Sequence, residues 1–199
     1  MVTHAMQPKA LERATLPSAP PGLFPGALGS AFERLPDCVR WLHRGASTQA
    51  RGVARVQGDP RWRARALRAI ARLPAPTDSI ALAFEVDAHA AGETWLRRFG
   101  DRVMRSELRR SPRVAHALEE RLGPVRLSFA CEIRDERLHW LLRELRVFGL
   151  ALPPRWFRDL RASCGDERGR YAFDIDVRLP LVGLLVAYSG WLEAVDDRA

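Results

Sequence analysis

Apolar and polar side chains alternate at a period of two through much of the last hundred residues of the chain. The segment from Arg170 to Leu179 is the clearest case. Its apolar positions are Tyr171, Phe173, Ile175, Val177 and Leu179, and charged residues between them are Asp174, Asp176 and Arg178. Because successive side chains point to opposite faces of an extended strand, this segment predicts a strand with one apolar and one polar face.

Further segments with strand character follow one another from Ile80 onward. They are Ile80–Val86, Trp95–Phe99, Val103–Arg109, Val114–Arg121, Leu127–Ile133, Trp140–Val147 and Leu184–Leu192. With residues 170 to 179 they make about eight strands in succession, which favours an antiparallel sheet over βαβ units. A sheet of that many twisted strands curls. We therefore expect an α+β fold, in which a curved antiparallel sheet, a half-barrel or barrel-like cup, has N-terminal helices packed against it.

The first part of the chain is organised differently. Residues 1 to 25 contain five prolines and little periodicity, which predicts a flexible leader before a single domain over residues 26 to 199. Two short helices, or one kinked helix, are expected from Ser30 and from Pro36. A strand is plausible over residues 49 to 57.

An amphipathic helix is predicted between Asp59-Pro60 and Leu73-Pro74. It has a basic stripe of Arg61, Arg65, Arg68 and Arg72 opposite an apolar stripe of Trp62, Ala66, Ile70 and Leu73. Two interpretations stay open. The apolar stripe packs on the sheet and leaves the arginines in solvent, or the helix docks onto a membrane surface or a partner protein.

Composition narrows the class of protein. The chain has 199 residues, is 47% hydrophobic and carries a net charge of +8, so it can bury a substantial single core. Nearly all of its basic residues are arginines, with Lys9 the one lysine, and they are spread along the whole sequence. Without a clustered basic tract, the charge indicates compositional bias, and we expect no nucleic-acid partner.

The sequence contains no motif for a disulfide framework, a metal site, a membrane span or a common catalytic site. The three cysteines, Cys38, Cys131 and Cys164, are far apart in the sequence and do not form closely spaced pairs. No disulfide framework or metal site is therefore expected. Neither a cleavable leader nor an apolar run long enough for a membrane span is evident, which predicts a cytoplasmic protein. No hydrolase, kinase or phosphate-loop motif is present, and no cofactor is expected.

A set of short motifs resembles a known bacterial family, DUF4166. The motifs are Leu35-Pro36 followed by Leu42-His43, Trp95-x-Arg97-x-Phe99-Gly100, Glu120-x-x-Gly123-Pro124, Gly149-Leu150-x-Leu152-Pro153 and Tyr188-x-Gly190-Trp191-Leu192. The resemblance covers roughly residues 26 to 193. Members of this family of unknown function occur alone or appended to saccharopine-dehydrogenase-like reductases, which implies a reductase-like partner. The glycine fingerprint of those reductases is absent here, so no nicotinamide site is implied.

Arg97 is the most informative candidate for a functional residue. Trp95 and Phe99 mark the buried face of a strand, and Arg97 lies between them on that same face. A buried arginine requires an acidic partner or an anionic ligand. Candidate partners are Glu107, Glu120 and Glu144. Three interpretations stay open: a structural ion pair forms, the Arg97 head group extends to the rim of the sheet, or Arg97 receives the carboxylate or phosphate of an apolar ligand.

The sequence thus predicts a domain that binds a small amphipathic or lipid-like ligand in an apolar pocket. The predicted ligand-binding residues are Arg97, Trp95, Phe99, Glu120, His43, Tyr188 and Trp191. Two alternatives stay open. One is an interaction module that docks to a reductase partner, and the other is an enzyme acting on a hydrophobic substrate, in which a histidine such as His43 meets a carboxylate such as Glu120.

Overall fold

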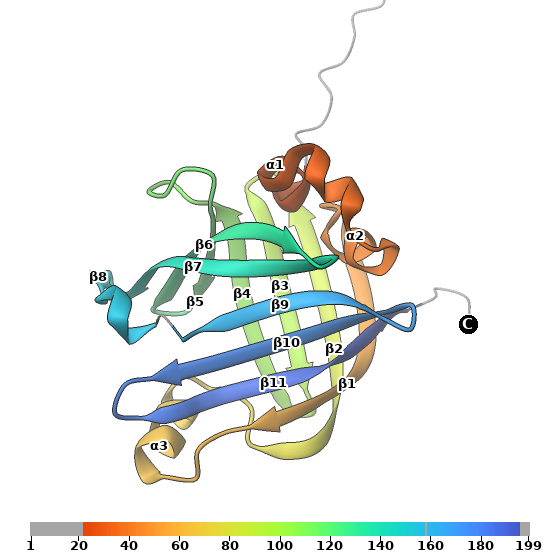
Figure 1. The fold of residues 1–199 in the computed structure, drawn as a ribbon. Helices are drawn as coiled ribbons and strands as arrows, with labels where there is room; N and C mark the ends of the chain where they lie inside the picture. The colour runs from red at the N-terminus through yellow and green to blue at the C-terminus, as the bar shows by residue number, and fades with distance from the viewer. Residues whose placement is uncertain (1–21, 158, 196–199) are drawn as a thin grey trace, which may run out of the picture.

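The computed structural model describes residues 22–157 and 159–195, which form an antiparallel β-barrel with short helices (Figure 1). The strands are β1 (Thr48–Gln57), β2 (Thr77–His89), β3 (Gly92–Phe99), β4 (Arg102–Arg110), β5 (Leu118–Leu122), β6 (Val125–Arg134), β7 (Arg137–Val147), β8 (Leu150–Ala151), β9 (Arg161–Glu167), β10 (Arg170–Leu179) and β11 (Gly183–Ala194). The helices are α1 (Leu23–Leu28), η1 (Gly29–Arg34), α2 (Asp37–His43), α3 (Trp62–Ile70) and η2 (Pro154–Trp156).

The sheet closes on itself. Its order is β6-β5-β4-β3-β2-β1-β11-β10-β9-β7-β8, and an additional pairing of β6 with β7 joins the two sides. Ten strands therefore form the barrel, and β8 is a short addition to the end of β7. The antiparallel sheet is confirmed, whereas the expectation of about eight strands in an open half-barrel or cup is corrected to ten strands in a closed barrel.

The two extra strands explain this difference. β1 pairs with both β2 and β11, so the segment that was only a plausible strand is central to the barrel. β9 was not expected, because its residues Ala162, Ser163, Cys164 and Gly165 lack an apolar alternation. It nevertheless pairs with β10 over seven positions, since backbone hydrogen bonds do not require apolar side chains.

The N-terminal helices lie at one end of the barrel, as expected (Figure 1). Phe24 of α1, Phe32 of η1 and Leu42 of α2 are buried in the core. The predicted leader, residues 1 to 25, falls mostly outside the described residues, and α1 already begins at Leu23. A further helix, α3, follows β1, so the helices do not all precede the sheet.

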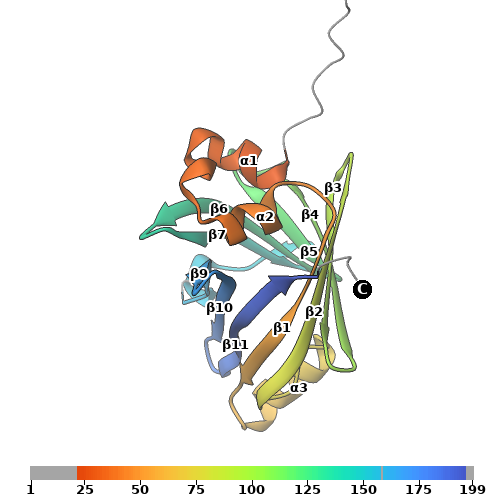
Figure 2. The ribbon, with the colours of Figure 1, turned by 90° about the vertical axis from the view of Figure 1, so that its right-hand side faces the viewer.

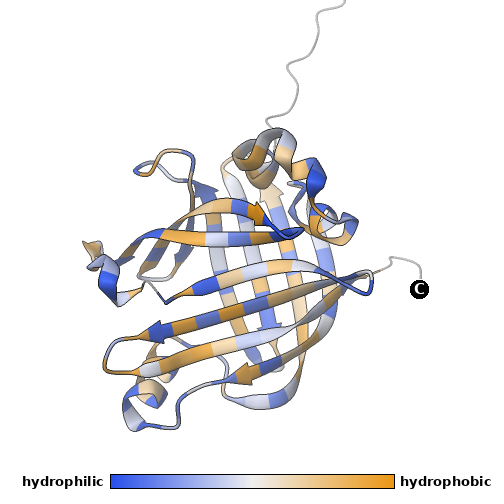
Figure 3. Ribbon diagram, in the orientation of Figure 1, coloured by the Kyte–Doolittle hydropathy of each residue, from blue (hydrophilic) through white to orange (hydrophobic). Residues whose placement is uncertain are grey.

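The period-two pattern places one face of every strand inside the barrel, and Figure 3 shows the alternation along the strands. Gly190 of β11 faces inward, and a Cβ added there would lie 2.0 Å from the carbonyl oxygen of Val53 on β1. Glycine is therefore required at this position by the close approach of a neighbouring backbone.

The weakest seam of the barrel lies between β7 and β9. Only Leu138 with Cys164 and His139 with Ser163 are paired across it, whereas β6 and β7 pair along their whole length. Beyond His139 the two strands diverge, and Figure 1 shows β7 and β9 fanning apart toward β8. The wall of the barrel is therefore least continuous beside the second half of β7.

The two ends of the barrel can be assigned from the topology alone. Because all neighbouring strands are antiparallel, successive connections alternate between the ends. The end where α1, η1 and α2 enter β1 is called the helix-capped end here. The connections β1–β2, β3–β4, β5–β6, β7–β9 and β10–β11 lie at the other end, called the distal end, and Figure 2 shows α3 there, away from α1 and α2.

Helix α3 packs in the opposite orientation to the one that its apolar stripe favoured. Arg68 is only 5% exposed, whereas Trp62 is 73% and Ile70 is 79% exposed. The Arg68 guanidinium donates hydrogen bonds to the carbonyl oxygens of Leu185 (3.0 Å) and Asp59 (2.9 Å). The expected burial of the apolar stripe is thus wrong for Trp62 and Ile70. The expected exposure of the arginines is wrong only for Arg68, because these backbone acceptors hold it against β11, whereas the other three arginines of the stripe are exposed.

Replacing Arg68 should therefore destabilise the fold. We expect Arg68→Met to lower the free energy of unfolding by about 2 kcal/mol, since two carbonyl oxygens lose a charged donor in a buried place. Urea unfolding followed by circular dichroism measures the change. Arg65→Met, on the exposed side of the same helix, is the matched control and should stay within about 0.5 kcal/mol of the original protein. If both variants lowered the free energy of unfolding equally, the orientation of α3 described here would be wrong.

Candidate functional site

Arg97 lies inside the barrel and is paired with Glu120. Its Nη2 donates a hydrogen bond to Glu120 Oε1 at 2.7 Å, and the two side chains are only 12% and 14% exposed. β3 directs Arg97 inward together with Trp95 and Phe99, and β5 directs Glu120 inward from two strands away. One of the three expected acidic partners is therefore the actual one.

The other two candidate acids belong to different ion pairs. Glu107 lies 3.9 Å from Arg121 on neighbouring β5, and both side chains are half-exposed. Glu144 pairs with Arg146 on its own strand and with Arg113 of the β4–β5 loop. Their strand positions direct them away from Arg97, which leaves Glu120 as its partner.

Aromatic rings surround the Arg97 head group. The guanidinium carbon lies 4.9 Å from the centre of the Trp95 ring and 5.6 Å from that of Phe84. Both contacts are cation–π interactions, which favour a cation held in a partly dry place. Burial opposes the charge on Arg97, but the carboxylate of Glu120 favours it, and the net result is a raised pKa.

His43 lies at the helix-capped end of the interior and is fully buried. Its Nε2 is 3.0 Å from the hydroxyl oxygen of Tyr171, with Cys164 Sγ at 3.8 Å. Its ring is 4.3 Å from that of Phe24 and 5.7 Å from that of Trp95, measured between centroids. Burial lowers the pKa of His43 to about 3, so the imidazole is neutral at neutral pH.

The groups around His43 are also held in their uncharged forms. Burial raises the pKa of the Cys164 thiol to about 12 and moves the pKa of Tyr171 well above its ordinary value. A protonated thiol is a weak nucleophile. This cluster therefore contributes packing and hydrogen bonding. The hydrogen-bond partner of His43 is Tyr171 and that of Glu120 is Arg97, so the described contacts do not join His43 to Glu120.

Tyr188 joins the interior site, whereas Trp191 does not. The Tyr188 ring lies 5.4 Å from that of Phe99, and its hydroxyl is close enough to influence the charge on Arg97. Trp191 is an odd number of residues from Tyr188 on β11 and so faces outward, where the guanidinium of Arg170 lies 4.3 Å from its ring centre. Six of the seven predicted ligand-binding residues thus face the interior.

The sequence did not single out Glu93, which is also inside the barrel. Its side chain accepts a hydrogen bond from Trp95 Nε1 at 2.8 Å, and its other carboxyl oxygen, Oε1, has no partner among the described residues. Burial raises the pKa of Glu93. The sequence did contain an indication of this inward position. Glu93 lies two residues before Trp95 and therefore on the same face of β3.

Much of the inward-facing apolar surface is only partly buried. The partly exposed inward residues include Leu122, Leu127, Ile175 and Val177 on β5, β6 and β10. In contrast, Phe84, Trp95 and Phe99 on β2 and β3 are buried. These partly exposed residues lie toward the distal ends of their strands.

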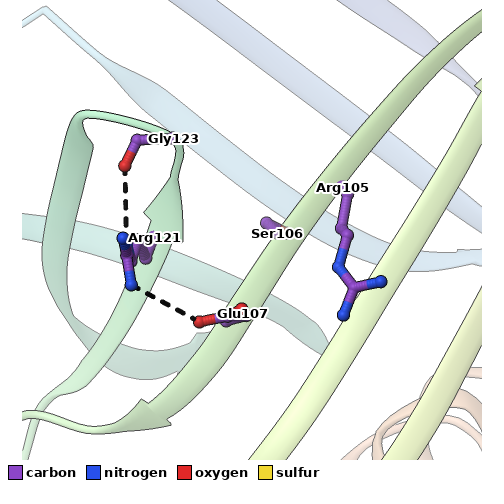
Figure 4. A pocket seen from close by; sticks show the side chains of 5 residues that line it. All are labelled: Arg105, Ser106, Glu107, Arg121 and Gly123. Atoms are coloured by element: carbon purple, nitrogen blue, oxygen red, sulfur yellow. Dashed lines mark hydrogen bonds and ion pairs between the residues drawn. The ribbon is translucent and has the colours of Figure 1, made fainter.

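Two shallow hollows on the outer surface have a different character. The larger, about 320 Å³, is lined by Asp159, Arg161, Asp176 and Arg178. The smaller, about 190 Å³, lies over β4 and β5, where Arg121 contacts both Glu107 and the carbonyl of Gly123 (Figure 4). Both are lined by charged side chains, and neither includes a predicted ligand-binding residue.

The sequence pattern of a domain of unknown function, DUF4166, matches residues 35–192. The chain belongs to the DUF4166 family. No curated protein matches it in sequence. The matched range begins just before α2 and ends within β11, so the DUF4166 domain includes α2 and the ten barrel strands almost completely.

In the described residues, no group of three or more histidine, cysteine, aspartate or glutamate side chains is arranged to hold a metal ion. In the same part of the chain, no helix has the length and apolar character needed to cross a membrane.

Burial of neutral His43 should make the fold sensitive to acid. An unfolded chain binds a proton at this imidazole below its ordinary pKa of 6.5, whereas the folded protein binds it only near 3. Lowering the pH from about 7 to about 5 should therefore remove about 2 kcal/mol from the free energy of unfolding through His43. Urea unfolding at several pH values measures this slope.

Two variants separate this effect from general acid sensitivity. His43→Phe keeps an aromatic ring in the core and should flatten the dependence of stability on pH over this range. His116→Asn changes an exposed histidine whose φ of 55° suits asparagine, and it should keep the original slope. A slope unchanged in His43→Phe would show that His43 is already protonated in the folded protein or does not control the transition.

Proposed function

We propose that the DUF4166 domain binds a small amphipathic molecule inside the barrel, with an acidic head group at Arg97 and an apolar body along the inward-facing walls. The observation that carries this proposal is the position of Arg97. Its charge is held inside a barrel lined mainly by apolar and aromatic side chains, beside Glu120, and its side chain is 12% exposed. Mostly apolar cavities with a few placed polar groups are typical of small-molecule sites.

The guanidinium retains capacity for a second anionic group. An arginine has five N–H donors in a planar fork, and among the described residues Glu120 is bonded through one terminal nitrogen at 2.7 Å. A carboxylate or phosphate can approach the remaining donors in bidentate geometry. Glu120 then has two effects: it holds Arg97 in place, and it competes with the ligand for the same positive charge.

The apolar body of the ligand would contact the partly exposed wall. Ile175 and Val177 on β10 and Leu127 on β6 supply aliphatic surface inside the barrel. Covering this surface is favourable because it removes apolar area from water. The proposal therefore requires a molecule with one acidic end and a hydrocarbon portion, such as a fatty acid.

A second candidate function is an interaction module that docks to a reductase-like partner. The observation that favours it is the exposure of Trp62 and Ile70 on α3, because exposed apolar residues with a polar surround occur at protein interfaces. The third candidate, an enzyme acting on a hydrophobic substrate, has less support, since His43 and Glu120 have separate partners.

Native mass spectrometry of the freshly purified protein tests for a retained small molecule. We expect a mass increase that disappears on denaturation, because an apolar ligand inside a barrel dissociates slowly. Extraction and mass analysis of the released compound should show an acidic group and a hydrocarbon portion. Retention of a polar cation or of a nucleotide would contradict the proposed chemistry.

Direct binding of dodecanoate, measured by isothermal titration calorimetry, tests the role of Arg97. We expect Arg97→Met to weaken binding by about tenfold to a hundredfold, because a charged hydrogen bond to the head group is lost. Glu120→Gln should instead tighten binding, since the competing carboxylate is removed. The double variant Arg97→Met with Glu120→Gln leaves no unpaired charge and should still bind weakly.

Arg98→Met is the matched control. Arg98 is the next residue on β3 but points outward, is 46% exposed and pairs with Glu85 at 3.4 Å. Its replacement should leave dodecanoate binding unchanged. Dodecanol, which lacks the acidic group, should bind the Arg97→Met variant and the original protein equally. If Arg97→Met and Arg98→Met gave the same affinity for dodecanoate in folded protein, the proposed head-group site would be wrong.

A further inference from the structure

The large apolar side chains that the structure leaves exposed gather at one end of the barrel. They are Trp62, Leu67 and Ile70 on α3, Val103 at the start of β4, Phe148 and Leu150 at the β7–β8 turn, Trp156 on η2 and Leu181 in the β10–β11 turn. These eight residues are called the apolar rim here. They belong to four different connections or strand ends, and all four lie at the distal end.

Among the described residues, the opposite end has no exposed large apolar side chain. Its turns carry polar residues, such as Asp135 and Glu136 between β6 and β7 and Arg168 between β9 and β10. Its apolar side chains, including Phe24 and Phe32, are buried under the helices. The apolar rim is therefore a property of one end of the barrel and does not result from a generally apolar surface.

Helix α3 adds positive charge beside the rim. Residues 60 to 76 contain five arginines and no acidic residue. Arg68 is buried against β11, whereas Arg61, Arg63 and Arg65 are exposed around Trp62. Three acidic residues at the same end are paired: Asp59 with Arg61 at 3.8 Å, Asp78 with Arg55 at 3.2 Å and Asp176 with Arg178 at 3.0 Å.

The burial of Arg68 determines which face of α3 is presented. Because Ala64 and Arg68, four residues apart, are the buried positions, Trp62, Ala66 and Ile70 share an outward stripe at four-residue spacing. Burying an arginine while exposing a tryptophan is costly in water. The arrangement is favourable when the outward stripe meets an apolar phase and the flanking arginines meet anions.

We infer that the distal end of the barrel docks onto a lipid bilayer that contains anionic phospholipids. The apolar rim inserts shallowly among the acyl chains, and Arg63 and Arg65 bind the phosphate groups. Charge complementarity selects this partner, because Arg63 and Arg65, which form no ion pair with an acidic side chain among the described residues, match a continuous anionic surface. Tryptophan is also favoured where apolar and polar phases meet. The interior site and the rim are separate surfaces, so this inference does not depend on the ligand proposed above.

Co-sedimentation with vesicles tests the inference. The full chain should sediment with vesicles of phosphatidylcholine mixed with phosphatidylglycerol and remain in solution with vesicles of phosphatidylcholine alone. The double variant Trp62→Ala with Ile70→Ala, and separately the double variant Arg63→Glu with Arg65→Glu, should each weaken binding to the anionic vesicles by about tenfold or more. Raising the salt concentration should weaken binding further, because the charged contacts are screened.

A matched pair at the other end controls for net charge. Arg34→Glu with Arg44→Glu makes the same change of charge at exposed residues near the helix-capped end, and it should retain binding. Arg97→Met should also retain it, which separates failure of the rim from failure of the interior site. The inference is overturned if anionic vesicles do not sediment the protein or if both arginine pairs lower binding equally. Loss of a dimer in Trp62→Ala with Ile70→Ala, without vesicle binding, would instead assign the rim to self-association.

Discussion

Closure of the sheet through β7 is the constraint on which the rest of this structure depends. β7 pairs with β6 along its length but with β9 at two positions only, so one strand joins the two sides of the barrel. Closure gives every strand an inside and an outside. Within that sheet, β4 alone separates Glu120 of β5 from Arg97 of β3, and both side chains face the interior. Because the β7–β9 contact is short, the same closure leaves the wall incomplete beside an apolar interior.

Arg97 and Glu120 form an ion pair inside the barrel. Burial disfavours charge on the other titratable groups there: it lowers the pKa of His43 and raises those of Cys164, Tyr171 and Glu93. Arg97 remains charged because Glu120 offsets its burial. Buried ion pairs contribute little net stability, since both partners lose hydration. Such a pair is more readily explained by a role in fixing strand pairing or in binding a charged group.

The two ends of the barrel differ because of the alternation of connections in an antiparallel sheet. Successive connections between strands lie at alternate ends of the barrel. Residues from distant parts of the sequence, such as Trp62, Phe148 and Leu181, therefore lie at the same end. Each of these residues is an ordinary exposed side chain when considered alone. Together they form an apolar surface at one end of the barrel, and this shared location can be recognised only when the strand order is known.

The alternation of apolar and polar residues by itself determined the antiparallel sheet and the inward face of Trp95, Arg97 and Phe99, because both follow from local strand geometry. The need of Arg97 for an acidic partner then followed from the cost of burying a charge. Only the tertiary structure decided which carboxylate that partner is, since the choice depends on strand order. It also reversed α3, because the acceptors of Arg68 come from Leu185 and Asp59, outside the helix. Closure required β9, whose pairing depends on backbone groups that leave no pattern in the side chains.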